Sequence, residues 1–130
     1  MKNKNDMLQK QIIRQSGVNV KKCMRCGKCS ATCPCYDEME YHPHQFVYMV
    51  ECGDIEPLIK SESLYRCLTC FACVDRCPRG VEPAKLIEAL RLSVIRRQGE
   101  NRLTPDGTAE YLDEDTPQQA LVSAFRKYTK

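Results

Sequence analysis

Residues 23–36 read CMRCGKCSATCPCY, and residues 67–78 repeat the same spacing as CLTCFACVDRCP. Each stretch carries cysteines in the pattern C-x2-C-x2-C-x3-C, and a proline follows the fourth cysteine. The first stretch supplies Cys23, Cys26, Cys29 and Cys33 before Pro34, and the second supplies Cys67, Cys70, Cys73 and Cys77 before Pro78. Two complete copies in one chain indicate an internal repeat, so the cysteine pattern is the feature that organises the fold.

These cysteines suit either disulfides or metal. The chain has 130 residues, ten cysteines and no tryptophan, and a small domain with a thin core often needs a covalent or metallic cross-link. Disulfide frameworks are typical of secreted proteins, but the start of the chain, MKNKNDMLQKQ, lacks the apolar core of a signal peptide. No segment approaches the roughly 20 apolar residues of a membrane span. We therefore expect a cytoplasmic protein whose cysteines bind metal.

The repeated spacing is the one by which bacterial ferredoxins hold iron–sulfur clusters. Two-residue spacers let a tight loop place three thiolates around one four-iron cube, and backbone N–H groups in such a loop can offset its negative charge. The alternative is zinc, because two C-x2-C pairs form a zinc ribbon. Zinc would leave four of the eight cysteines unused, including both Cys-Pro pairs, so the sequence favours two 4Fe–4S clusters.

Hydrophobic periodicity and capping signals predict a mainly α fold, with the cysteine stretches as loops and single turns. We expect helices over residues 4–16, 44–52, a short segment led by Ser61 or Ser63, residues 82–98 and residues 116–127, with Gly17, Gly53 and Gly99 as stop signals. The side chains expected to face the core are Met7, Leu8, Ile12 and Ile13 in the first helix and Leu86, Ile87, Leu90, Val94 and Ile95 in the fourth. No strand pattern is evident.

Apolar residues and a glycine within the cysteine stretches suggest supporting roles. Gly27 suits a loop backbone with positive φ, but the second stretch has Phe71 at that position, so the requirement is not expected to be general. Leu68, Phe71 and Val74 are interpreted either as core residues or as residues that keep water from a cluster.

Two cysteines and two histidines lie outside the repeated pattern. Cys35 and Cys52 are interpreted as small buried side chains, with a redox pair or a spare ligand as the alternative. His42 and His44 flank Pro43 and are expected to begin the second helix rather than to bind metal.

Charge is segregated along the chain. Residues 1–28 carry eight basic side chains and one acidic one, whereas residues 37–62 carry one basic and seven acidic. Such blocks suit docking to charged protein partners, and the lack of interleaved aromatic residues argues against nucleic acid. No glycine-rich dinucleotide loop or nucleophile–base pair is visible. Any chemistry on a substrate is therefore expected on another chain.

Residues 20–99 resemble the C subunit of heterodisulfide reductase. The matching stretches are CMRCGKCSATCP, HPHQFVYMVECGD and LYRCLTCFACVDRCPRGVEPAKLIEALRLSV. The resemblance implies an alpha-helical ferredoxin domain with two 4Fe–4S clusters, flanked by an N-terminal helical extension (residues 1–19) and by an acidic linker with a last helix (residues 100–130). It also implies an electron relay between a flavin-containing A-like subunit and a cysteine-rich B-like subunit that reduces a disulfide.

The sequence is also compatible with other parent enzyme complexes. Related modules occur in succinate and fumarate reductases and in glycerol-phosphate or glycolate oxidoreductases, and a free two-cluster ferredoxin is a further alternative. In each oxidoreductase the chain would be a subunit of an enzyme with no catalytic site of its own.

The resemblance also implies crossed ligation, as in two-cluster ferredoxins. One cluster would be held by Cys23, Cys26, Cys29 and Cys77, and the other by Cys67, Cys70, Cys73 and Cys33. Three intervening residues and a following proline carry the fourth cysteine of each stretch away from the cube of its neighbours.

Overall fold

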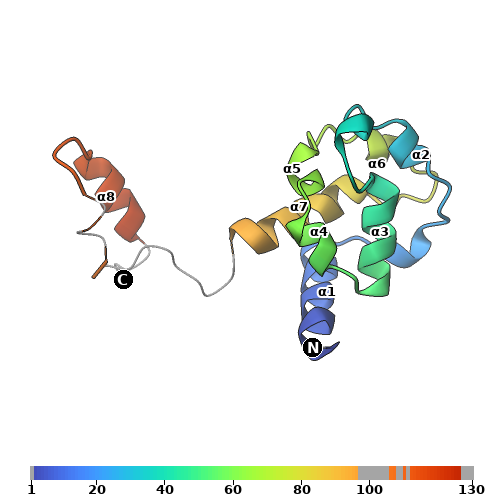
Figure 1. Ribbon diagram of the computed structural model, residues 1–130, viewed down its shortest axis with the longest axis horizontal. Helices are drawn as coiled ribbons and strands as arrows, with labels where there is room; N and C mark the ends of the chain where they lie inside the picture. Colours follow the sequence, from blue (N-terminus) through green and yellow to red (C-terminus); the bar gives the residue numbers. More distant parts are fainter. Residues whose placement is uncertain (1, 97–105, 108–109, 111, 127–130) are drawn as a thin grey trace. The chain divides into compact units, whose positions relative to one another are not determined.

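The computed structural model describes residues 2–96, 106–107, 110 and 112–126, which form helices and loops with no strand among them (Figure 1). The α-helices are α1 (Lys2–Ser16), α2 (Lys28–Ala31), α3 (Pro43–Cys52), α4 (Glu56–Lys60), α5 (Ser63–Arg66), α6 (Ala72–Arg76), α7 (Pro83–Ile95) and α8 (Gln118–Phe125). Single 3-10 turns cover Val20–Lys22 and Tyr36–Glu38. The mainly helical fold expected from the sequence is confirmed.

The chain divides into two compact units, Met1–Gln98 and Gly99–Lys130. The first contains α1 to α7 with both cysteine stretches, and the second contains α8. The three-part division expected from the sequence stays a prediction. In the described part of the chain, no helix has the length and apolar composition needed to cross a membrane.

Helix α7 is the centre of the first unit, because α1 and α3 both pack against it. Its Leu86 and Leu90, one turn apart, are fully buried together with Ile12 of α1 and Phe46 of α3. Each such burial stabilises the fold by about 1.5–3 kcal/mol. Met7, expected in the core, is exposed, because a residue five positions before Ile12 lies on a different face of the helix.

The helix ends follow the expected signals in part. Gly53 ends α3 with φ 80° and donates its N–H to the carbonyl of Val50 at 3.2 Å. Helix α7 ends earlier than expected, at Ile95, because Arg96 leaves the helical conformation with φ −123°. Ile95 is consequently exposed. Gly99, Arg97 and Lys127, expected near helix ends, lie outside the described residues.

The short helices of the two cysteine stretches, α2 and α6, pack against each other. Each follows a residue with positive φ, which is Gly27 (74°) before α2 and Phe71 (62°) before α6. Two residues earlier, Arg25 (56°) and Thr69 (55°) also match. The repeat is therefore one of backbone conformation, and Phe71 adopts the positive φ that Gly27 adopts in the first stretch.

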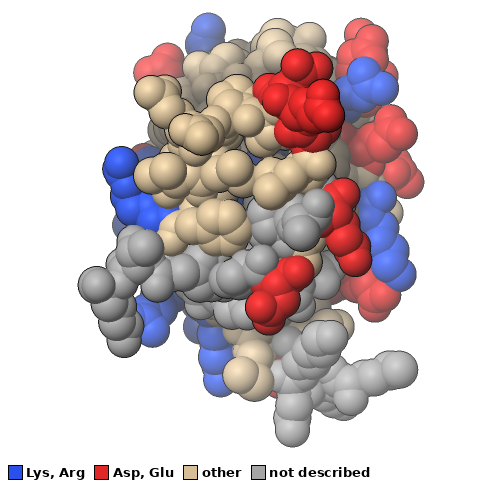
Figure 2. All heavy atoms as spheres, turned by 90° about the vertical axis from the view of Figure 1, so that its left-hand side faces the viewer, with Lys and Arg blue, Asp and Glu red and all other residues tan. Residues whose placement is uncertain are grey.

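Surface charges of opposite sign are partly paired. The guanidinium of Arg66 lies 3.7 Å from Glu38 and 3.4 Å from Glu62, and Lys60 lies 2.6 Å from Glu56. Exposed pairs of this kind contribute little to stability. Figure 2 shows side chains of both signs of charge among the described residues.

Candidate metal centres

Two hollows lie at the cysteine stretches of the first unit. The first hollow is lined by four cysteines, Cys23, Cys26, Cys29 and Cys77, and has a volume of about 340 Å³ including its open mouth. Three of these residues come from the first cysteine stretch, and Cys77 comes from the end of the second.

The second hollow has the reverse composition. Cys67, Cys70 and Cys73 come from the second stretch, and Cys33 comes from the end of the first. Its volume is about 330 Å³, again including its mouth. A fifth thiol, Cys35, also lines this hollow. Each hollow therefore combines three cysteines of one stretch with the last cysteine of the other.

Local packing explains this exchange. Helix α2 carries Cys29 and helix α6 carries Cys73, and their contact brings the two loops side by side. The start of α7 borders both hollows, because Pro83 lines the first and Ala84 lines the second. The packed helix α7 thus supports both groups of cysteines.

Arg91 of α7 fixes the beginning of the second stretch. Its guanidinium donates to the carbonyl of Leu64 at 2.7 and 3.0 Å and to the carbonyl of Cys67 at 2.8 Å. These charge-assisted bonds satisfy carbonyls at the end of α5, where the helix provides no partner. They hold Cys67 against the core.

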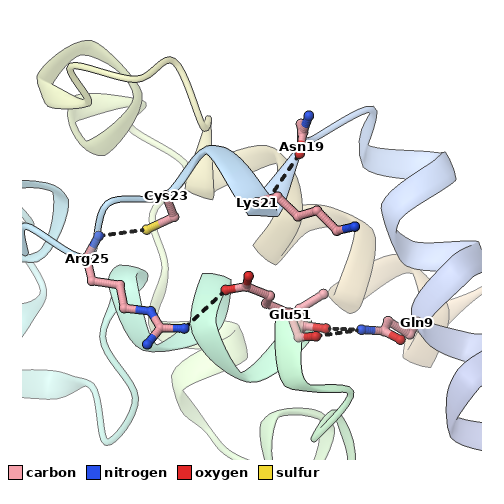
Figure 3. Close-up of polar contacts among 7 residues, drawn as sticks. Gln9, Asn19, Lys21, Cys23, Arg25 and Glu51 are labelled. Carbon is pink, nitrogen blue, oxygen red and sulfur yellow. Dashed lines mark hydrogen bonds and ion pairs between the residues drawn. The ribbon is translucent and has the colours of Figure 1, made fainter.

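The first stretch is held on α3 and α1 (Figure 3). The guanidinium of Arg25 lies 3.5 Å from the carboxylate of Glu51 and 4.5 Å above the ring centre of Tyr48. Gln9 of α1 donates its side-chain N–H groups to the carbonyls of Val50 (2.6 Å) and Glu51 (3.0 Å). This chain of contacts connects α1 to the loop that carries Cys23.

Hydrogen-bond donors surround the sulfurs of the first hollow. The backbone N–H of Arg25 donates to Sγ of Cys23 (Figure 3), and that of Val81 donates to Sγ of Cys77, both at 3.4 Å. Ser30 interacts with the Cys29 thiol through its hydroxyl and its backbone N–H. N–H donors in this position can offset the negative charge of a thiolate-bound cluster.

Burial opposes thiol ionisation at three of the cysteines. It raises the pKa of Cys29 and of Cys33, and it raises the pKa of Cys73 to about 11. A bound metal must displace these thiol protons, so the site is poised for a strongly bound, thiophilic group rather than for free thiolates.

The donor set fits an iron–sulfur cluster in each hollow. Iron–sulfur clusters are held by four cysteine thiolates, and each hollow offers at least four thiols. Among the described residues, no three His, Cys, Asp or Glu side chains converge on one point as a single ion would require. The cysteines instead line the walls of two hollows, four or more to each.

The structure also brings residues to the first hollow that the sequence did not identify. His44 and Arg79 line it. The hydroxyl of Ser30 lies 2.6 Å from Nδ1 of His44 and accepts the backbone N–H of His44 at 3.1 Å. Burial lowers the pKa of His44, which favours the neutral form of the ring. The sequence predicts only that His44 begins α3, whereas the structure also places it in the lining of the hollow that contains Cys29.

Several residues near the second hollow differ from expectation. Leu68 and Phe71 line it but are 68% and 40% exposed, so they form its rim and not part of the core. Val74 is half-buried. Cys35 is half-buried at the hollow, whereas Cys52 is exposed, so its interpretation as a buried side chain is wrong.

Comparison with known protein families agrees with this geometry. Residues 19–81 match the family described as "4Fe-4S dicluster domain". The segment that carries both cysteine stretches is therefore similar to a 4Fe–4S dicluster domain. The two 4Fe–4S clusters expected from the sequence are thereby confirmed as its cofactors.

Individual proteins are also similar to this chain. The chain is 34% identical over 74 residues to the iron–sulfur C subunit of CoB–CoM heterodisulfide reductase from Methanopyrus kandleri, covering 57% of this chain and 38% of that protein. It is 30% identical over 94 residues to a second form of this C subunit, from Methanocaldococcus jannaschii, covering 72% and 50%. It is 32% identical over 87 residues to the C subunit of ferredoxin:CoB–CoM heterodisulfide reductase from Methanosarcina acetivorans, covering 67% and 35%.

These matches confirm the resemblance drawn from the sequence, and the chain is a relative of the C subunits of heterodisulfide reductases. It spans between about a third and a half of the length of these three relatives.

Proposed function

We propose that this chain is an electron-transfer subunit with crossed thiolate ligation. Cys23, Cys26, Cys29 and Cys77 hold one 4Fe–4S cluster, and Cys67, Cys70, Cys73 and Cys33 hold the other. The observation that carries the proposal is the mixed origin of the four cysteines around each hollow. When bound, the clusters supply one-electron carriers whose potentials depend on their surroundings.

The side chains around the hollows divide each site into a protected side and an open side. Val47 and Ile87 are buried and close the first and second hollow, respectively, toward the core. Cys26 and Cys70, the middle cysteines of the two loops, are exposed. A partner that exchanges electrons therefore approaches at Cys26 or Cys70, while the core excludes water from the opposite wall.

We further propose that the chain works within a heterodisulfide-reductase-type complex. It relays electrons between a flavin-containing A-like subunit and a cysteine-rich B-like subunit, and the reduction of a disulfide takes place on the latter. The names of the relatives, which describe the C subunits of such enzymes, support this assignment. The segregated charge of the chain supports docking to other proteins.

Anaerobic affinity purification from the native source tests this function. We expect a tagged chain to bring down a flavoprotein and a second cysteine-rich protein, with about eight irons bound per copy of this chain. A chain that carries two clusters but purifies alone, and that exchanges electrons with diffusing partners, would be a free ferredoxin and would contradict the complex. A chain without iron would contradict the electron-transfer role itself.

A further inference from the structure

The two hollows differ in the charged groups on their walls. Arg79 lines the first hollow, and it forms no ion pair with any of the described residues. No carboxylate of the described residues therefore neutralises its positive charge. None of the residues that line the second hollow is charged, and the guanidinium of Arg91, which donates to the backbone carbonyl of Cys67 at 2.8 Å, is not among them.

The hollows also differ in the donors that face their sulfurs. In the first, N–H groups of Arg25 and Val81 reach Cys23 and Cys77, and Ser30 interacts with Cys29 through both its hydroxyl and its N–H. Within the part of the chain that the structure describes, Thr69 makes no bond to Cys67 like that of Arg25 to Cys23, although its φ is nearly the same.

The second hollow has fewer hydrogen-bond donors to its sulfurs than the first. Among the described residues, its cysteines interact with the N–H groups of Cys35 (at Cys33) and Ala84 (at Cys73). Its remaining wall consists largely of the apolar residues Pro34, Pro43, Leu68, Phe71 and Ile87. The first hollow has similar apolar walls, which include Val47, Val81 and Pro83, so Arg79 and the donors to the sulfurs are what distinguish it.

Reduction of a thiolate-bound cluster adds one negative charge to a site that is already negative. Nearby cations and N–H donors to the sulfurs stabilise the reduced form, and apolar surroundings destabilise it. We infer that the first hollow is the higher-potential site, with Arg79 and Ser30 as the residues that raise its potential. An electron that enters at the second hollow then moves to the first, and one carrier is oxidised as the other is reduced.

This inference rests on the proposed function and assigns a direction to it. The open side at Cys70 becomes the place where an electron donor docks, and the open side at Cys26 becomes the place where the acceptor docks. The two copies of the repeat thus differ in the reduction potential of their clusters, although their backbone conformations match.

A reductive titration of the full chain with its clusters in place tests the order. Dithionite supplies electrons under anaerobic conditions with mediator dyes, and electron paramagnetic resonance follows each cluster. The two signals are assigned beforehand with Cys77→Ser for the first hollow and the double variant Cys33→Ser, Cys35→Ser for the second. We expect the signal of the first hollow to appear at the higher potential.

Arg79→Gln identifies the cause of the difference. It should lower the midpoint potential of the first hollow and leave that of the second unchanged, and Arg79→Lys should restore most of the shift because it retains the charge. Arg14→Gln is the matched control, since Arg14 is an exposed cation on α1 that lines neither hollow. It should move neither potential.

The experiment separates a failure of the proposed function from a failure of the proposed order of potentials. A wild-type chain that binds no iron overturns the proposed function. If the chain binds eight irons but the cluster of the second hollow is reduced first, or the two midpoint potentials coincide, only the proposed order of potentials is overturned. Equal effects of Arg79→Gln and Arg14→Gln overturn the role of Arg79.

Discussion

Cys29 and Cys77 lie in different cysteine stretches, yet both line the first hollow. The contact between α2 and α6 brings the two stretches together. A group bound to both thiols would close a long loop of chain, and such closures restrict the unfolded state most. Cluster binding would therefore stabilise the thin core of the first unit as well as supply the redox centre.

Single cysteine variants separate crossed from local ligation. Cys77→Ser removes a thiolate from the first hollow, so it should convert or abolish the cluster held by Cys23, Cys26 and Cys29 and spare the other. Iron content and paramagnetic resonance of the anaerobic protein measure this. Loss of the cluster at Cys67, Cys70 and Cys73 instead would indicate that each stretch holds its own cluster.

The reciprocal variant needs a background without Cys35. Cys35 lines the second hollow beside Cys33, so its thiol is in position to replace a missing ligand. Cys33→Ser combined with Cys35→Ser should therefore disrupt only the second cluster. Cys35→Ser alone, the matched control, should retain about eight irons per chain.

Arg91 should matter for the second cluster and not for the first. Arg91→Ala removes three hydrogen bonds from a guanidinium to backbone carbonyls, and each such charge-assisted bond contributes about 1.5–3 kcal/mol. We expect the cluster beside Cys67 to be lost to a chelator at least tenfold faster. Arg91→Lys should restore little, because a lysine lacks the planar fork that serves two carbonyls at once.

The rate of chelation, followed by visible absorbance and by paramagnetic resonance, checks this prediction. Arg14→Ala on α1 is the control and should leave the rate unchanged. Equal loss of both clusters in Arg91→Ala would show that Arg91 supports the whole unit and not the loop of Cys67 in particular.

At the positive-φ position of each cysteine stretch, glycine should stabilise the fold more than alanine, which is the reverse of their order in a helix interior. Gly27 has φ 74°, and an added Cβ would meet no heavy atom within 4 Å. Gly27→Ala should therefore cost about 1 kcal/mol from conformation alone.

Phe71 occupies the same conformation at φ 62°. Phe71→Gly should be more stable than Phe71→Ala by about 1 kcal/mol, because both variants lose the ring but only glycine relieves the backbone. Denaturant midpoints of the anaerobic, cluster-loaded variants measure both effects. Greater stability of Phe71→Ala would contradict the strain assigned to this residue.

The sequence predicts the cysteine groups and most helices well because both depend on local rules. The spacing of Cys23, Cys26 and Cys29 is set by one loop, and α3 begins at Pro43 and ends at Gly53 through local capping. The hydrophobic stripe of α7 likewise follows from helical periodicity.

The rest depends on contacts between distant segments. Arg79 reaches the first hollow only because α2 and α6 pack together, and Ser30 meets His44 across the loop that leads into α3. The positive φ of Phe71 also escapes prediction, because an aromatic residue disfavours that conformation and only the structural repeat reveals it. Cys52 is exposed at the end of α3, and its residue type alone predicts the opposite.

Anomalous diffraction at the iron edge from crystals of the anaerobic protein tests the central claim most directly. Crossed ligation by two 4Fe–4S clusters predicts two separate groups of four irons per chain, one bonded to Cys23, Cys26, Cys29 and Cys77 and the other to Cys67, Cys70, Cys73 and Cys33. A single metal ion in either hollow, or a first group bonded to Cys33 in place of Cys77, would contradict it.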